Sequence, residues 1–309
     1  MLRYALVRIA WLIPTLLAMA LVTFVIMHAT PGSPLDPQAP NANPLSPELQ
    51  RNLADKYGLD KPLYIQFFTF LKNVVRLDFG ISYIYRTRSV SEILAGTFPI
   101  SLQLGAMAFV FAALGGIVLG TLAAVHHNSW IDYLCVVLAT MGVSLPNFVT
   151  GVLLLLLFSL TLGLFPVAGW DAPRNWVLPT ITLGLPELGV IARYTRASVL
   201  EVVHADYTRT ARAKGLAERV VVTRHVLKNA LIPVVTYLGP LLAAIGTGSF
   251  FVESIYSVPG MGKFFVLSMS GRDYNMIMAV ILLYGAFLGV MNLVVDLTYG
   301  LLDPRIMYM

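Results

Sequence analysis

The sequence predicts an all-α polytopic membrane protein with six transmembrane helices, and three observations lead to this fold class. Only 12% of the 309 residues are charged, whereas soluble proteins average about 25%. Apolar runs of about 20 residues recur along the chain, which is the length that a helix needs to cross a bilayer. Basic residues gather in one polar segment between two of these runs, as is typical of a cytoplasmic loop.

The composition also excludes several classes of protein. Much of the net charge of +5 lies in residues 193–228, and the chain offers no soluble scaffold for reading bases, so we expect no nucleic-acid partner. The single cysteine, Cys135, lies in an apolar run and matches no zinc spacing, which is typical of a small buried residue. The five histidines show no metal-ligand spacing either. We therefore expect no metal site.

The first predicted span covers about Ile9 to Ala29 of an N-terminal segment, residues 1–29. Arg3 and Arg8 precede it, as in a signal peptide. Its apolar stretch is nearer 20 residues than the roughly 7–15 of a signal peptide, and no small-residue cleavage site follows directly. We interpret it as an uncleaved span whose N-terminus lies in the cytoplasm.

Residues 30–100 differ in composition and are predicted to form a long extracytoplasmic loop with short surface helices. Ser46 and Pro47 are a plausible N-cap and first position for a short polar helix, Glu48–Tyr57. The segment Leu63–Val75 mixes aromatic and polar residues, which is typical of an amphipathic helix at the membrane surface. A third short helix, Val90–Phe98, is expected to end before Pro99.

The transmembrane core is predicted over residues 101–299, followed by a cytoplasmic tail, 300–309. The Gly116-x-x-x-Gly120 spacing in its first helix is one that lets two helices approach closely. Proline occurs inside several of these spans, where neighbouring helices or water must satisfy the freed carbonyls. The five core spans are about 101–125, 133–162, 176–192, 231–252 and 276–297.

Loop charges predict that both termini are cytoplasmic. Segment 193–230 then lies inside the cell, together with the short loop 126–132, while the outer loops 163–175 and 253–275 carry few basic residues. The basic residues of the inner segment are Arg193, Arg196, Arg209, Arg212, Lys214, Arg219, Arg224 and Lys228.

This inner segment is the strongest functional candidate. Asp206–Lys214 favours a helix, with Asp206 near its positive end and Lys214 near its negative end. Gly215 is a natural C-terminal stop, and a second helix from about Ala217 leads into the fifth span. Such a protrusion can seat in a groove on a partner. A solvated basic loop is the alternative that composition alone leaves open.

The sequence here resembles a known family. Ala211-x-x-x-Gly215, followed by His225-x-Leu-Lys-Asn-Ala-Leu-x-Pro233, is similar to the cytoplasmic signature of binding-protein-dependent ABC importer permeases. More narrowly, the chain resembles the first permease subunit of the oligopeptide, dipeptide and nickel group. The further stretches that carry this resemblance are Thr30–Pro34, Lys56–Pro62, Asp78–Gly80, Gly142–Phe148, Ala192–Arg196, Pro259–Gly262 and Asp303–Pro304.

The resemblance implies which residues couple the chain to an ATPase. Where many permeases have Glu-Ala-Ala, this chain has Arg209-Thr210-Ala211, and Lys228 replaces the usual later proline. A contact that needs the missing glutamate is therefore not expected. The implied coupling residues are Arg209, Thr210, Ala211, Arg212, Ala213, Lys214, Gly215, Leu216, His225 and Asn229.

The resemblance also implies a type I ABC importer permease fold and a division of labour. The expected partners are a homologous second permease, two cytoplasmic ATPase subunits and an extracytoplasmic peptide-binding protein, within the lipid of a prokaryotic plasma (inner) membrane. The sequence contains no G-x-x-x-x-G-K-[ST] phosphate loop. We therefore expect no cofactor on this chain and no catalysis by it, with ATP and Mg²⁺ on the partner subunits.

Charged groups at membrane depth are candidates for the substrate path. Glu187, inside the fourth span, could meet a peptide amino terminus, could face a water-filled cavity or could pair with a partner helix; Ser144 and Asn147 are further candidates. Arg193 and Arg196 lie where long side chains reach the membrane surface. Glu253, near a span end, is expected to form an interfacial or inter-subunit pair.

Three alternatives remain open from the sequence. The same machinery could import nickel or another small solute. An ion-coupled secondary transporter would show an internal repeat of broken spans, and none is apparent. An intramembrane enzyme would need a nucleophile and a base at membrane depth, and no catalytic signature accompanies the available residues.

Overall fold

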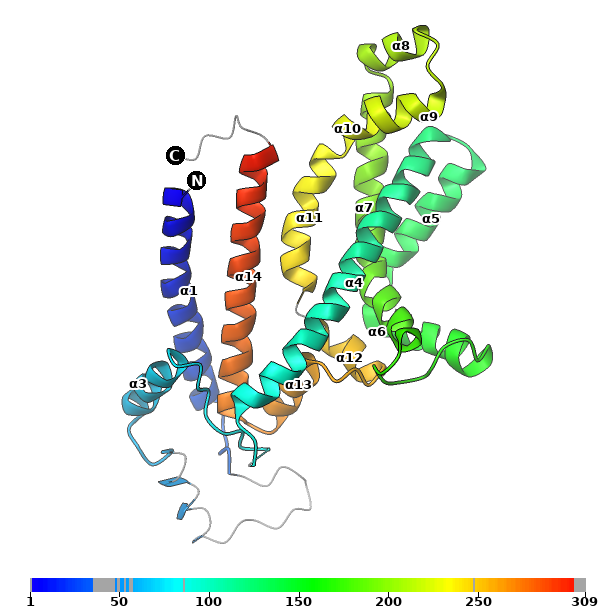
Figure 1. The fold of residues 1–309 in the computed structure, drawn as a ribbon. Coiled ribbons are helices and arrows are strands. Elements are labelled where there is room, and N and C mark those ends of the chain that lie inside the picture. The colour runs from blue at the N-terminus through cyan, green and yellow to red at the C-terminus, as the bar shows by residue number, and fades with distance from the viewer. Residues whose placement is uncertain are drawn as a thin grey trace. The chain divides into compact units, whose positions relative to one another are not determined.

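The computed structural model describes residues 2–35, 48, 51–52, 54–55, 58–85, 87–246 and 248–302. Within these residues the chain is helical, and its only β pairing is an isolated bridge between Ile81 and Ser89. The chain divides into two compact units (Figure 1). Unit 1 comprises residues 1–100, 260–293 and 307–309, and unit 2 comprises residues 101–259 and 294–306.

Unit 1 is built on two long apolar helices that lie side by side, α1 and α14 (Figure 1). Their contact is close because glycines on α14 leave room for α1: a Cβ at Gly285 would lie 2.8 Å from the sulfur of Met19. Phe24 of α1 is buried against this pair and contacts Phe67 of α3. The elements of this unit are α1 (Leu2–Ala29), α3 (Leu63–Val74), the start of α4 (Val90–Val125), α13 (Met261–Ser270) and most of α14 (Tyr274–Leu302).

A fully buried carboxylate, Asp273, anchors the segment before α4 to the start of α14. Its oxygens accept hydrogen bonds from the Ser82 hydroxyl and from the backbone N–H groups of Ile84 (3.4 Å) and Met276 (3.2 Å). A buried carboxylate is tolerated only when such donors satisfy it. The same group therefore caps α14 and holds the loop.

Unit 2 contains the rest of α4, which packs against α7 through small residues. A Cβ at Gly116 would lie 2.6 Å from the Ile191 side chain, and one at Gly120 would lie 2.6 Å from Cβ of Thr195. The close helix approach predicted from Gly116-x-x-x-Gly120 is confirmed. The following elements are α5 (Trp130–Ser144), α6 (Asn147–Leu154), the π-helix η1 (Leu155–Thr161) and α7 (Pro173–Val203).

The remaining elements of unit 2 include the segment that the sequence singled out. They are α8 (Asp206–Ala213), α9 (Glu218–Val220), the π-helix η2 (Val221–Val226), α10 (Leu227–Ala230), α11 (Ile232–Ile245) and α12 (Phe250–Ile255). Glu253 of α12 is fully buried and accepts a 2.8 Å hydrogen bond from Ser101. This partner belongs to the same unit, and the interfacial or inter-subunit pair expected from the position of Glu253 near a span end stays a prediction.

Two prolines behave opposite to expectation. The predicted continuous span 133–162 is broken, because Leu145, held extended before Pro146 (φ −93°, ψ 128°), separates α5 from α6 with a bend of 111°. The predicted break at Pro99 is absent, since α4 runs through it. Val90 and Ile93 are buried in unit 1 ahead of Pro99, and this packing keeps the first turns helical.

The described helices account for only some of the six predicted spans. Three are long and apolar enough to cross a membrane, Ala5–Ala29, Val90–Val125 and Tyr274–Leu297, and up to five are if each of two bent pairs counts as one span. The bent pairs are Trp130–Ser144 with Asn147–Thr161, and Glu218–Ala230 with Ile232–Ile245. The predicted span 176–192 lies within α7, a longer helix that carries Glu187 and two internal prolines.

The long loop after the first helix is described in part. Helix α3 matches the predicted surface helix at Leu63–Val75 to within one residue. Most of the predicted helix Glu48–Tyr57, the cap at Ser46 and the end of the tail 300–309 lie outside the described residues.

Candidate functional sites

The predicted protrusion of unit 2 is a helix, a glycine and a second helix. Helix α8 covers Asp206–Ala213, and Gly215 follows in the left-handed conformation (φ 75°), which glycine adopts without strain. The backbone N–H of Gly215 donates to the carbonyl of Arg212 at 2.9 Å and closes the turn. In Figure 1, α8 stands at one end of the unit, beyond α9 and α10. The predicted helix and its glycine stop are therefore confirmed.

One side of α8 is packed against its own chain. Ala211 is only 4% exposed and lies in a cluster with Val199, Val221 and Val226. Thr208, three residues earlier, is fully buried, and its hydroxyl donates to the carbonyl of Val202 at 3.0 Å. Ala211 therefore seats α8 on α7 and η2 and does not offer a small surface to a partner.

Arg212 is also occupied within the protrusion. Its guanidinium donates to both carboxylate oxygens of Glu218, at 2.7 and 3.1 Å, and to the carbonyl of Val203 at 3.2 Å. The hydrogen bonds from Arg212 to Glu218 raise the pKa of the guanidinium above its usual value. These bonds bridge Gly215, so Arg212 fixes the angle between α8 and α9.

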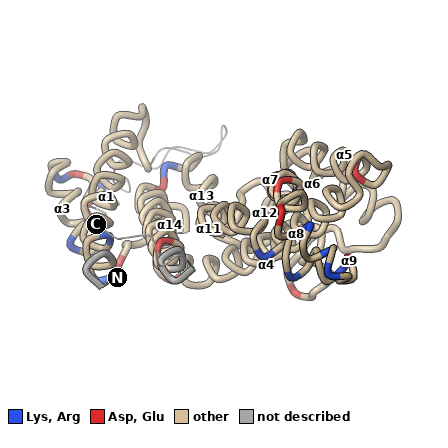
Figure 2. Tube along the Cα trace, turned by 90° about the horizontal axis from the view of Figure 1, so that it is seen from above, with Lys and Arg blue, Asp and Glu red and all other residues tan. Residues whose placement is uncertain are grey.

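The outward side of the protrusion is exposed and basic. Figure 2 shows blue Lys and Arg positions around α8 and α9, whereas the tube of α11 carries none. The residues that remain open to a partner are Arg209, Thr210, Ala213, Lys214, Gly215 and Leu216. Of the other predicted coupling residues, His225 is half-buried in η2, and the Asn229 amide donates to the Tyr207 hydroxyl at 3.0 Å.

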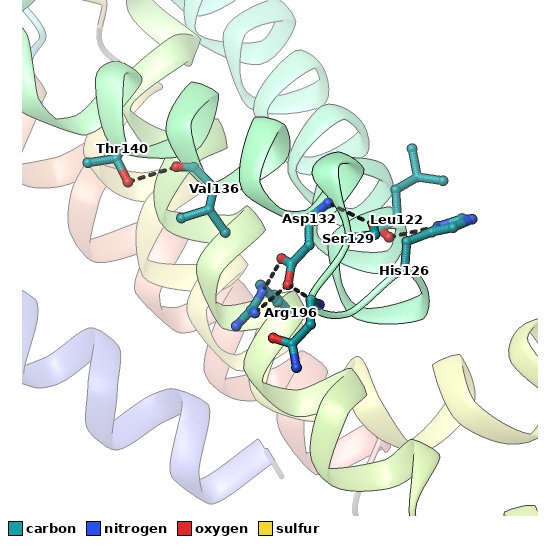
Figure 3. Close-up of polar contacts among 8 residues, drawn as sticks. Leu122, His126, Ser129, Asp132, Val136, Thr140 and Arg196 are labelled. Carbon is teal, nitrogen blue, oxygen red and sulfur yellow. Dashed lines mark hydrogen bonds and ion pairs between the residues drawn. The ribbon is translucent and has the colours of Figure 1, made fainter.

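A buried ion pair fixes the base of this region. Asp132, at the start of α5, accepts hydrogen bonds from Arg196 of α7 at 2.7 and 2.8 Å, and its side chain is 3% exposed (Figure 3). The backbone N–H of Asn128, in the left-handed conformation, donates to the same carboxylate at 3.0 Å. Ser129 caps α5 by accepting from the N–H of Asp132. The pair ties the α4–α5 turn to α7.

Sequence reasoning missed this pair, since it assigned Arg196 to the membrane surface. The sequence carries a signal only for the cap: Ser129 followed three residues later by Asp132 is an N-cap pattern. No sequence spacing joins residues 132 and 196, so only the fold supplies the partner.

The three predicted substrate-path residues are not brought together by any described hydrogen bond. Ser144 is exposed at the end of α5, and Asn147 begins α6 across the break at Pro146. The buried Oδ1 of Asn147 has no hydrogen-bond partner among the described residues. Glu187 of α7 is half-buried and accepts a 2.7 Å hydrogen bond from the Tyr237 hydroxyl of α11. Pairing with a partner helix, one of the alternatives for Glu187, is thus observed.

Family models cover nearly all of the chain. Residues 116–308 match the model described as binding-protein-dependent transport system inner membrane component. Residues 1–105 match the model for the N-terminal part of the membrane component of such systems. The two matches are separated by residues 106–115 of α4, and together they include both units.

Curated relatives match over their full length. The chain is 44% identical to the dipeptide transport system permease protein DppB of Bacillus subtilis, over 99% of this chain and 98% of that protein. It is 39% and 40% identical to the oligopeptide transport system permease proteins OppB of Haemophilus influenzae and Escherichia coli K12, over 100% of each chain.

Solved structures agree on the fold. A chain of the MetNI methionine ABC transporter in an inward-facing conformation superimposes with a TM-score of 0.54 at 16% identity, covering 68% of this chain and 96% of that one. A chain of an amino acid ABC transporter gives 0.51 at 15% identity, covering 70% and 95%. With the fold, the matched models and the full-length relatives in agreement, this chain belongs to the inner membrane components of binding-protein-dependent transport systems, the permease subunits of ABC importers.

Proposed function

We propose that this chain is a membrane-spanning permease subunit that moves short peptides across the prokaryotic inner membrane. The observation that carries the proposal is the match, end to end, to permeases named for dipeptides and oligopeptides at 39–44% identity. The chain forms half of a translocation path with a homologous second permease. Two cytoplasmic ATPases bind ATP and Mg²⁺, and an extracytoplasmic binding protein delivers the peptide.

The α8 protrusion is the proposed contact with an ATPase. It is rigid for three reasons: Ala211 is buried, Thr208 is hydrogen-bonded, and Arg212 bridges to Glu218. A rigid element can transmit a push from a closing ATPase, because little of the movement is lost within it. The outward residues Arg209 and Lys214 are free to meet acidic groups on the partner's rim, each such exposed pair contributing about 0–1 kcal/mol.

Reconstitution tests the proposal directly. The chain is co-expressed with a second permease, ATPase subunits and a peptide-binding protein of the same kind of system, and the complex is placed in vesicles. We expect ATP-dependent uptake of radiolabelled trialanine that requires the binding protein, with no ATP hydrolysis by the purified chain alone. Uptake of nickel but not trialanine would assign the smaller cargo, and uptake driven by a proton gradient without ATPases would contradict the proposal.

Single cysteines test the proposed topology on a Cys135→Ser background. Ala217 is exposed at the tip of the protrusion, and Lys263 is exposed at the start of α13 in the predicted outer loop. With both termini in the cytoplasm, Ala217→Cys should react with an impermeant maleimide only in inverted vesicles, and Lys263→Cys only in intact cells. Labelling of both from one side would overturn the orientation.

A further inference from the structure

Helix α3 of unit 1 has three sides with different surroundings. The first side packs on the cluster that α1 and α14 form, and it includes Phe67 and Leu71. The second side lines a cavity of about 370 Å³, and its polar residues are Gln66, Thr69 and Asn73. The third side is exposed in the part of the chain that the structure describes. Its composition therefore indicates what lies outside the protein at this point.

The third side is a row of apolar side chains. Tyr64 is 65% exposed, and Phe68, one turn later, is 66% exposed. Val75, which ends the helix with helical φ and ψ (−59°, −25°), continues the row and is 86% exposed. Residues spaced in this way share one face of an α-helix. A helix that packs through its only apolar side exposes polar residues elsewhere, whereas α3 has a second apolar side that faces outward.

Helix α3 contacts α1 near the end of the first span (Figure 1). The ring centroids of Phe67 and Phe24 are 5.2 Å apart. The 25 residues Ala5–Ala29 of α1 are about 37 Å long, whereas the hydrocarbon core of a bilayer is about 30 Å thick. Phe24 lies about 7.5 Å of helical rise before Ala29. The contact with α3 therefore lies near the boundary between acyl chains and headgroups.

The surface of α1 beside this contact is apolar and exposed. Only 11% of the most apolar stretch of α1 is buried by the rest of the described chain. Val22, Val25 and Ile26, in the same turns as Phe24, are each more than half exposed. In a membrane-spanning chain such a surface is covered by the bilayer. Helix α3 packs on these turns, so its exposed row continues an apolar surface at the same depth.

We propose that Tyr64, Phe68 and Val75 insert into the bilayer, so that α3 lies along the membrane surface and holds the end of α1 there. Aromatic rings suit this boundary, because their apolar body enters the acyl chains and a tyrosine hydroxyl still reaches water. Lys72, one turn after Phe68, extends its apolar stem and keeps its ammonium among the headgroups. The side with Thr69 faces water. With cytoplasmic termini, the leaflet is the outer one.

Fluorescence quenching in the complete complex, reconstituted in phosphatidylcholine vesicles, tests this lipid contact. Phe68→Cys and the control Thr69→Cys, both on the Cys135→Ser background, are labelled with bimane. Thr69 is the exposed neighbour of Phe68 on the cavity side. A nitroxide at the lipid headgroup should quench the label at position 68 several times more strongly than the label at position 69. Aqueous iodide should give the reverse order, and Tyr64→Cys should behave like Phe68→Cys.

Three results would overturn the inference. Equal quenching by iodide at positions 68 and 69 would place the row in water. Quenching at position 68 by neither probe would mean that the second permease or the binding protein covers it, and a preparation without the binding protein would tell which. Strongest quenching by a nitroxide at the end of the acyl chain would place α3 deep in the hydrocarbon. Peptide uptake by the wild-type complex is measured separately, so the lipid contact and the proposed function can fail independently.

Discussion

Two ion pairs of unit 2 have the same shortest distance and very different surroundings. Arg196 and Asp132 approach to 2.7 Å with side chains 28% and 3% exposed, whereas Arg212 and Glu218 approach to 2.7 Å with side chains 38% and 53% exposed. Distance alone would rank them as equals. The energies of the two pairs nevertheless differ. Water solvates and screens the exposed Arg212–Glu218 pair, whereas little water reaches the Asp132 carboxylate of the other pair.

The difference separates two kinds of contact at the base and tip of the protrusion. Removing one partner of a buried pair leaves a charge without compensation and costs about 3–5 kcal/mol. Removing one partner of an exposed pair costs about 0–1 kcal/mol. The buried pair therefore holds unit 2 together, and the exposed pair adjusts the geometry of the protrusion.

The largest effect is expected for Asp132→Ala, which leaves Arg196 facing a buried space. We expect a loss of about 3 kcal/mol, toward the low end of the range because Arg196 is 28% exposed. Thermal unfolding of the purified chain in detergent measures it. The double variant Asp132→Ala with Arg196→Met removes both charges and should recover much of the loss; no recovery would show that the ion pair is not the cause.

Ala211→Asp comes next, because it puts a carboxylate among Val199, Val221 and Val226. We expect a loss of about 2–3 kcal/mol, detachment of α8 and weaker binding of the ATPase. Ala213→Asp is the matched control, since Ala213 is exposed on the same helix. Ala213→Asp should unfold like the wild type in thermal melts; equal destabilisation by both would mean that α8 has no buried side.

A smaller stability effect is expected for Gly215→Leu. The left-handed conformation costs a side chain about 1 kcal/mol, and nothing lies within 4 Å of a Cβ there. Gly163→Leu is a close control, because Gly163 is also left-handed with open space around it. Both should lose similar stability, but only Gly215→Leu should leave ATP hydrolysis uncoupled from uptake. Normal coupling in both would remove the glycine from the ATPase contact.

The smallest effect is expected for Arg212→Ala, at about 0–1 kcal/mol, and it should shrink as salt is raised. The uptake rate should fall clearly while the melting temperature changes little, because α8 loses its fixed angle to α9. Paired measurements of melting temperature and uptake at low and high salt check this. A loss of stability as large as that of Asp132→Ala would show that the exposed and the buried pair contribute equally to stability.

Local features of the sequence predicted much of the fold. The helix over Asp206–Ala213 and its glycine stop follow from capping and dipole preferences, and the surface helix follows from the mixed pattern of Leu63–Val75. The two prolines show the limit. Pro99 and Pro146 look alike in sequence, yet α4 passes through the first because Val90 and Ile93 are packed in unit 1, and the chain breaks before the second, where α6 packs on α7 and α12.

The features of the candidate sites likewise fall into those that the local sequence predicts and those that only the fold shows. The exposure of Arg209 and Lys214 could be predicted from their charge, and their part in the ATPase contact stays a prediction. The burial of Ala211 against its own chain could not be predicted, because a small residue suits a partner's groove and a chain's own core equally well. The partner of Arg196 and the tyrosine on Glu187 are 64 and 50 residues away in sequence, and no local pattern encodes them.

The π-helix η2 determines how the helices that follow it, α10 and α11, are rotated about their axes relative to α8. A π turn holds one more residue than an α turn, so η2 changes the direction in which the side chains of α10 and the start of α11 point relative to α8. Deleting one residue within Val221–Val226 would favour an ordinary α-helix and turn α10 and the start of α11 by about 100° relative to α8. The wide turn thus sets the rotation of α11, which carries Tyr237, relative to the exposed side of α8.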